Sequence, residues 1–199
     1  MLEELYRLDR DLLIYLNSLH HPVLDIIMTA VSGKWFWTPM YGVIVAWLIV
    51  NFKKRSLLLL PCIALSVALA DRISSGFFKP YFERFRPCHD GRICELLHIP
   101  DGCGGYYGFI SSHAANSFVV AMLLHLLLLP GFKKYRAFLW FWAILVSYSR
   151  VYLAAHYPAD IIMGGLLGIL VGWLVYMLYR FLELKIFGDH FRLSPEIKY

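Results

Sequence analysis

Charged side chains are scarce in this chain. Only 17% of its 199 residues are charged and 59% are hydrophobic, whereas a typical soluble domain has about 25% charged and about 45–50% apolar residues. This shortage of charge excludes an ordinary soluble domain and predicts an integral membrane protein. Internal repeats and low-complexity linkers are also missing. The length suits one compact helical bundle, so we expect a single all-α membrane domain over residues 1–199.

A cleavable signal peptide is absent from the N-terminal sequence, MLEELYRLDRDLLIYLNSLHH. A signal peptide begins with a basic segment followed by an uninterrupted apolar one. This segment instead begins with acidic residues and alternates charge with Leu, Ile and Tyr. The pattern predicts an amphipathic helix over residues 1–21 that lies at the membrane interface.

Apolar stretches fill most of the remaining chain. A membrane-spanning helix needs about 20 residues, within a range of roughly 17–25, and only the first stretch is clearly shorter. We expect a polytopic bundle of about six membrane-spanning helices, of which the first is short or tilted. The expected helices cover Pro22–Val31, Trp35–Phe52, Leu57–Phe78, His113–Leu129, Ala137–Leu153 and Pro158–Leu182.

Acidic residues are absent from two short basic segments, NFKKRS at 51–56 and GFKKYR at 131–136. Positive charge in short loops marks the cytoplasmic side of a membrane. We therefore expect these loops in the cytoplasm and the long polar loop 79–112, in which acids balance bases, on the outer side. An even number of spans would leave both termini cytoplasmic. The net charge of +5 is then explained by membrane orientation, and no nucleic-acid partner is expected.

Three polar clusters interrupt the apolar sequence on the expected outer side. They read KPYFERFRP at 79–87, GFISSHAANS at 108–117 and SRVYLAAHYPAD at 149–160. Charges beside hydrocarbon are costly unless they are paired or hydrated, which favours a shared polar pocket. The side chains that would share it are Lys79, Arg86, Ser111, Ser112, His113, Arg150, His156 and Asp160.

The residue types in these clusters suit phosphate chemistry. Arginine forks match phosphate oxygens and lysine adds a point charge, while a serine before an apolar run is typical of a helix N-terminus, which binds phosphate through free N–H groups. Asp160 follows His156 by four residues, so the carboxylate can orient the imidazole for nucleophilic attack. His113 is a suitable acid for a leaving group because an unperturbed histidine has a pKa of about 6.5.

The sequence resembles the type-2 phosphatidic acid phosphatase superfamily, which also includes vanadium haloperoxidases and glucose-6-phosphatases. The signatures of that superfamily read K-x6-RP, PSGH and SR-x5-H-x3-D. Here they stand as KPYFERFRP, ISSH and SRVYLAAHYPAD. The first and third match at every defining position, and the second departs at Ile110 and Ser112, where the family has Pro and Gly.

The resemblance implies a role for each residue of the shared pocket. Lys79, Arg86 and Arg150 would hold the phosphate oxygens, together with Ser111 and the backbone near Ser112. His156 would form a phosphohistidine oriented by Asp160, and His113 would protonate the leaving group and then help to activate water. The resemblance implies no metal and no cofactor, because fixed cations stabilise the transferring phosphoryl group. Activity is expected to survive the serine at 112.

A pocket at the membrane boundary favours lipid phosphates over soluble sugars. The candidate substrates are lipid A, undecaprenyl diphosphate, phosphatidylglycerol phosphate and phosphatidic acid, with a bacterial envelope lipid, either of the first two, preferred. We expect a bacterial inner-membrane enzyme with a periplasmic active site and no obligate protein partner. The alternative hypothesis is a catalytically silent protein that binds or transports lipid phosphates.

The remaining histidines, glycines and cysteines are expected to have mainly structural roles. His125 and the glycines of the last apolar stretch, Gly164, Gly165, Gly168 and Gly172, are expected to pack helices together. Cys62 is expected to be a core residue. Two of the three outer-loop cysteines would form a disulfide in an oxidising compartment, and the pairing is open among Cys88, Cys94 and Cys103. Zinc binding with His89 or His98 is disfavoured because no CxxC pair is present.

Overall fold

The computed structural model describes residues 2–128 and 130–189. Within them the chain is helical, and the one β-type pairing is an isolated bridge between Phe85 and Tyr107. The all-α prediction is confirmed. The helices are α1 (Leu2–Ser18), α2 (Pro22–Ser32), α3 (Thr38–Phe52), α4 (Ser56–Asp71), α5 (Lys79–Phe82), α6 (Ser112–Leu127), α7 (Lys133–Tyr152) and α8 (Pro158–Phe187), and a π-helical segment, Arg72–Phe78, joins α4 to α5.

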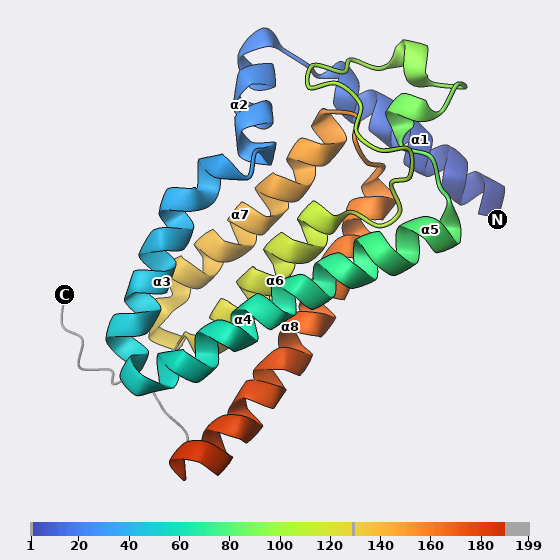
Figure 1. Ribbon diagram of the computed structural model, residues 1–199. Coiled ribbons are helices and arrows are strands. Elements are labelled where there is room, and N and C mark those ends of the chain that lie inside the picture. The colour runs from blue at the N-terminus through green and yellow to red at the C-terminus, as the bar shows by residue number, and fades with distance from the viewer. Residues whose placement is uncertain (1, 129, 190–199) are drawn as a thin grey trace.

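The helices α2 and α3 follow one another in the same direction along the bundle (Figure 1). Gly33 ends α2 in an extended conformation while its N–H still bonds the carbonyls of Thr29 and Ala30. A 3-10 turn at Trp35–Trp37 then leads directly into α3. The break at Gly33 is therefore a bend and not a reversal, and the expected six separate crossings are not confirmed.

The described chain begins and ends at opposite ends of the bundle. α1 lies across the end that also carries the loop between α5 and α6, whereas α8 runs to the other end (Figure 1). The basic turn Lys53–Arg55 and the start of α7 lie at that second end. The expectation that both termini share one side is not confirmed by the described residues, and Met1 and residues 190–199 lie outside them.

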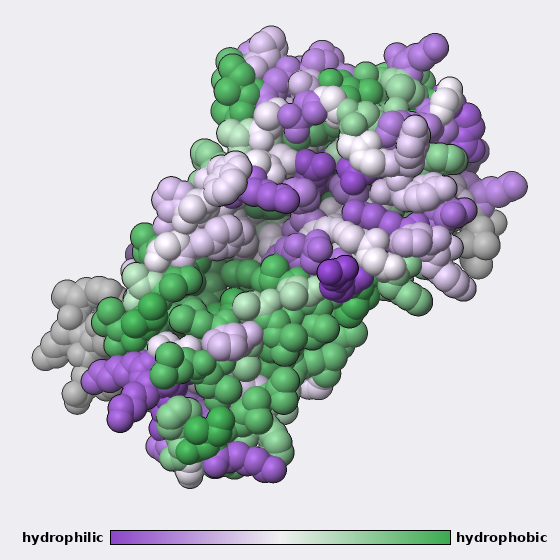
Figure 2. Space-filling view, in the orientation of Figure 1, coloured by the Kyte–Doolittle hydropathy of each residue, from purple (hydrophilic) through white to green (hydrophobic). Residues whose placement is uncertain are grey.

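The outer surface of the bundle is broadly apolar. By length and composition, the helical stretches Trp35–Phe82, which contains α3 and α4, and Pro158–Phe187 could cross a membrane, and Pro22–Ser32 and Ser112–Leu127 are shorter apolar helices. Figure 2 shows hydrophobic side chains over much of the bundle, with hydrophilic ones at the end carrying α1 and the long loop and again at the opposite tip. This banding is what a bilayer requires.

The closest helix packing joins α6 to α8 through glycines. A Cβ atom at Gly164 would lie 2.5 Å from the Ser111 carbonyl oxygen, and one at Gly168 would lie 2.3 Å from the Ala115 carbonyl oxygen. Neither distance is tolerated, so only glycine allows the two backbones this close. The predicted packing role of these glycines is confirmed, and the contact places the N-terminus of α6 against the first turns of α8.

We expect Gly168→Ala to lower the thermal unfolding temperature in detergent, because overpacking of this kind costs roughly 1–3 kcal/mol. Gly42→Ala in α3 is the matched control, since a Cβ there meets nothing within 4 Å and alanine favours the helix by about 1 kcal/mol. Equal melting temperatures for the two variants would contradict the proposed close contact.

Candidate active site

The three polar clusters meet at one cavity of about 910 Å³. Its deeper walls come from apolar side chains of α3, α4, α6 and α7, such as Leu48, Leu60 and Leu124. Its polar end is lined by Arg86 of the long loop, His113 of the first turn of α6 and His156, which precedes α8. The polar and charged side chains lining that end include Ser32, Lys34, Ser75, Lys79, Arg86, Ser112, His113 and His156.

The long loop folds back on itself to deliver Arg86. The Arg86 N–H donates to the Tyr106 carbonyl and the Gly108 N–H donates to the Arg84 carbonyl, each at 2.8 Å. A Cβ atom at Gly108 would lie 3.1 Å from Arg86 Cγ, 3.2 Å from Asp160 Oδ2 and 3.5 Å from His156 Nδ1. Gly108 therefore lets the loop approach the histidine closely, a role that no sequence pattern signalled.

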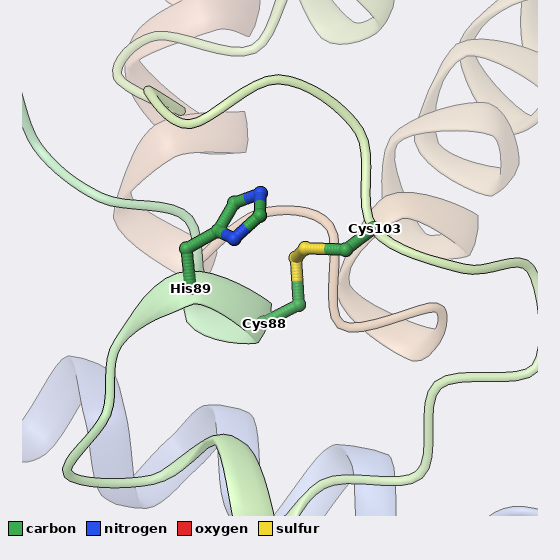
Figure 3. A group of neighbouring side chains, drawn as sticks. All are labelled: Cys88, His89 and Cys103. Atoms are coloured by element: carbon green, nitrogen blue, oxygen red, sulfur yellow. A yellow bond between two sulfur atoms is a disulfide. The ribbon is translucent and has the colours of Figure 1, made fainter.

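A disulfide between Cys88 and Cys103 closes the same loop, with 5.9 Å between their Cα atoms (Figure 3). The structure thus defines the pairing that the sequence left open, and Cys94 remains a thiol. His89 lies beside this disulfide. Disulfide sulfurs are not the thiolates that zinc binds, and His98 is hydrogen-bonded to Asp25 at 2.9 Å. Zinc binding therefore gains no support from these residues.

His156 and Asp160 form a buried pair at the start of α8. The His156 ring nitrogen Nδ1 lies 3.4 Å from Asp160 Oδ2, and the side chains are 1% and 0% exposed. That separation is longer than an ideal hydrogen bond. Asp160 Oδ2 also accepts the Tyr157 N–H at 3.0 Å, and the Asp160 carbonyl accepts the Ser111 N–H at 3.0 Å. The second and third clusters are therefore joined through Asp160.

Burial keeps the imidazole of His156 neutral. It lowers the pKa of His156 to about 4, because removal from water disfavours the protonated ring, although the neighbouring Asp160 carboxylate partly offsets this. The cations Arg86 and Arg150 lower the pKa further. A neutral imidazole near neutral pH has a free electron pair, which is the state that a nucleophile needs.

Ser112 contacts Lys79 in the wall of the cavity. The Lys79 ammonium donates to Ser112 Oγ at 3.2 Å. From the π-helical segment, Ser74 donates to the same oxygen at 3.0 Å, and the Ser75 hydroxyl lies 2.8 Å from it. The serine that replaces the family glycine thus holds a cation with its own hydroxyl. Ser74 and Ser75 belong to none of the three sequence clusters, so no motif pointed to them.

The remaining candidates differ in their access to the cavity. Arg150 donates to Ser32 Oγ at the end of α2, and His113 lines the cavity directly. Ser111 is fully buried, and its hydroxyl accepts the Ala114 N–H as the N-cap of α6. Direct contact of the Ser111 side chain with a bound anion therefore gains no support. Ser32 and Lys34 were missed because α2 was expected as a separate span.

Comparisons with known proteins agree on one family. The family model described as the PAP2 superfamily matches residues 55–183. The lipid A 4'-phosphatase of Bacteroides thetaiotaomicron is 38% identical over 95% of this chain and 84% of its own length. That of Porphyromonas gingivalis is 34% identical over 100% of this chain and 84% of its own length.

A solved structure shares the fold. The crystal structure of a transmembrane PAP2-type phosphatidylglycerolphosphate phosphatase from Bacillus subtilis has a TM-score of 0.66 and 25% sequence identity. The match covers 95% of this chain and 90% of that one.

We expect Ser112→Ala to weaken binding of inorganic phosphate by about tenfold, because a hydrogen bond to a charged group contributes about 1.5–3 kcal/mol. Calorimetric titration of the purified protein measures the affinity. Ser66→Ala in α4 is the control, since Ser66 bonds only the Ile63 carbonyl and should leave phosphate affinity unchanged. Unaltered affinity in Ser112→Ala would show that Lys79 needs no such anchor.

Proposed function

Because this chain belongs to the PAP2 superfamily, we propose that it is a membrane-embedded phosphatase that hydrolyses the phosphate headgroup of an envelope lipid. One observation carries the proposal: a cavity of about 910 Å³ has cations and a buried histidine at its polar end and apolar helices along its depth. A lipid phosphate has the same division, with a charged head and apolar chains.

The proposed reaction gives each of these side chains a role, including Arg150, which does not line the cavity itself but donates to Ser32, which does. Lys79, Arg86 and Arg150 bind the phosphate oxygens and offset the negative charge that develops on them during transfer. His156 Nε2 attacks phosphorus while the bond to the leaving oxygen breaks, and Asp160 at Nδ1 supports the imidazole as its charge rises. A phosphohistidine and the dephosphorylated lipid result.

His113 completes the proposed cycle. It lines the same cavity as His156, from the first turn of α6. His113 gives a proton to the departing oxygen and then takes one from the water that attacks the phosphohistidine. Inorganic phosphate leaves and His156 returns to its neutral form.

Lipid A is the proposed substrate, with its 4'-phosphate as the group removed. The relatives from Bacteroides thetaiotaomicron and Porphyromonas gingivalis, 38% and 34% identical over the aligned residues, are both named lipid A 4'-phosphatase. Undecaprenyl diphosphate, phosphatidylglycerol phosphate and phosphatidic acid share the required headgroup chemistry and form the comparison panel.

We also propose how the chain lies in a bacterial inner membrane. The basic residues Lys53–Arg55 and the start of α7 lie at the end opposite the site, and positive segments favour the cytoplasm. The site then faces the periplasm, α1 lies at that interface, and α8 ends in the cytoplasm. In this arrangement α2 and α3 make one pass, and α4, α6, α7 and α8 make one each.

We expect purified protein in detergent with chelator to release phosphate from lipid A faster than from the other panel lipids. His156→Ala removes the nucleophile and should abolish release, and vanadate, which mimics pentacoordinate phosphorus, should inhibit. His125→Ala is the matched control on α6, because His125 contacts Trp140 and not the cavity. Binding of lipid phosphates without turnover would support the silent binding protein instead.

The pH dependence tests the state of His156 separately. Since its pKa is lowered to about 4, protonation that removes the nucleophile needs a lower pH than for an ordinary histidine. We expect kcat/KM to persist to about pH 5 and to fall near pH 4. The substrate's own ionisation is titrated by phosphorus NMR and subtracted. An acid limb near pH 6.5 that the substrate does not explain would contradict the buried, neutral nucleophile.

A further inference from the structure

Arg84 lies two residues before Arg86, yet it points away from the cavity. It lines a separate outer cavity of about 810 Å³ between α1 and the long loop. Its Nη1 donates to Asp160 Oδ1 at 2.8 Å, and its Nη2 donates to Asp9 Oδ2 at 2.6 Å. Arg84 therefore connects the amphipathic helix α1 to the carboxylate beside His156.

Asp9 is itself fixed to the start of α8. Its other oxygen, Oδ1, accepts the Ala159 N–H at 2.8 Å, which satisfies a free N–H group of the first helical turn. The side chains of Asp9 and Arg84 are 10% and 17% exposed, so the pair is shielded from water and salt more than a surface pair is. The three groups form a closed connection between α1, the long loop and α8.

The two carboxylate oxygens of Asp160 have different partners. Oδ1 accepts from Arg84, while Oδ2 contacts His156 Nδ1 and accepts the Tyr157 N–H. The Arg84 guanidinium is also stacked 4.0 Å from the centre of the Tyr157 ring. A carboxylate held at both oxygens cannot rotate, so the imidazole meets one fixed partner.

We propose that Arg84 and Asp9 are positioning residues for phosphoryl transfer, which act through Asp160 to hold His156 in the orientation for attack. The inference rests on the proposed phosphatase function. It extends the catalytic unit beyond the residues of the three signatures and makes α1 part of it. Neither residue touches the cavity that would hold the substrate, so both act on turnover and not on substrate binding.

Arg84 also reduces the electrostatic effect of the Asp160 carboxylate on His156. The groups that face His156 are Asp160 beside it on α8, Arg86 from the loop, Arg150 from α7 and His113 from α6. Arg84 neutralises part of the Asp160 charge. Without Arg84, the Asp160 carboxylate would stabilise the protonated imidazole more strongly, so the pKa of His156 would rise.

Arg84→Gln tests the proposal. We expect kcat to fall by about 10–100-fold, the range typical when a partner that orients an active-site group is lost, with KM changed by less than about twofold. The acid limb of kcat/KM should move to higher pH. Arg84→Lys keeps a charge but offers no fork for two carboxylates, so it should recover the acid limb and only part of kcat.

Asp9→Asn tests the far end of the connection. The amide oxygen can still accept the Ala159 N–H, but the charge that holds Arg84 is lost, so we expect a smaller loss of kcat than in Arg84→Gln. The double variant should be no slower than Arg84→Gln alone, because residues acting as one unit are not additive. Asp11→Asn is the matched control, since exposed Asp11 on the same helix pairs with its exposed neighbour Arg10 and should behave as wild type.

All variants are assayed on the best lipid substrate and on p-nitrophenyl phosphate, and thermal melting confirms that each is folded. Wild-type kcat and an unmoved acid limb in Arg84→Gln, a raised KM with unchanged kcat, or additive losses in the double variant would each overturn the positioning role. A wild-type protein that hydrolyses neither kind of substrate would instead refute the proposed function. If Arg84→Gln does not fold, Arg84→Lys and Asp9→Asn carry the same test.

Discussion

The close backbone contact between α6 and α8 is the constraint on which the rest of the site depends. Glycines at 164 and 168 let the two helices approach until no Cβ atom would fit. At that separation the Ser111 N–H reaches the Asp160 carbonyl at 3.0 Å. The start of α6, which carries Ser112 and His113, is thereby fixed relative to the start of α8, which follows His156. Helix packing by small residues thus fixes the relative positions of side chains in the candidate site.

The site balances buried charges through a chain of partners. Asp160 is fully buried, and a buried carboxylate is stable only when it is paired and hydrogen-bonded. Arg84 and the Tyr157 N–H supply those partners, while Lys79 and Arg86 line the cavity. The two positions suit different roles. A cation that contacts Asp160 would orient the histidine, whereas a cation that lines the cavity would bind the substrate.

The same cavity combines two environments. Its polar end is held by the loop that the Cys88–Cys103 disulfide closes, and its depth is lined by helices that also present apolar side chains to the outside. A headgroup can therefore enter the polar end without its chains leaving an apolar surrounding. This geometry, together with membership of the PAP2 superfamily, makes a lipid phosphate a better match than a soluble ester.

The sequence by itself determined the helical class, the membrane setting, the residues of the three clusters and the packing role of the glycines, because hydrophobic runs and motif spacing are local properties. The tertiary structure decided what depends on the path of the chain. At the Gly33 bend, α2 and α3 continue in one direction, and Ser32 at the end of α2 meets Arg150. The tertiary structure also pairs Cys88 with Cys103 and not with Cys94. It joins Asp9, Arg84 and Asp160, which are far apart in sequence and whose contact no local pattern encodes.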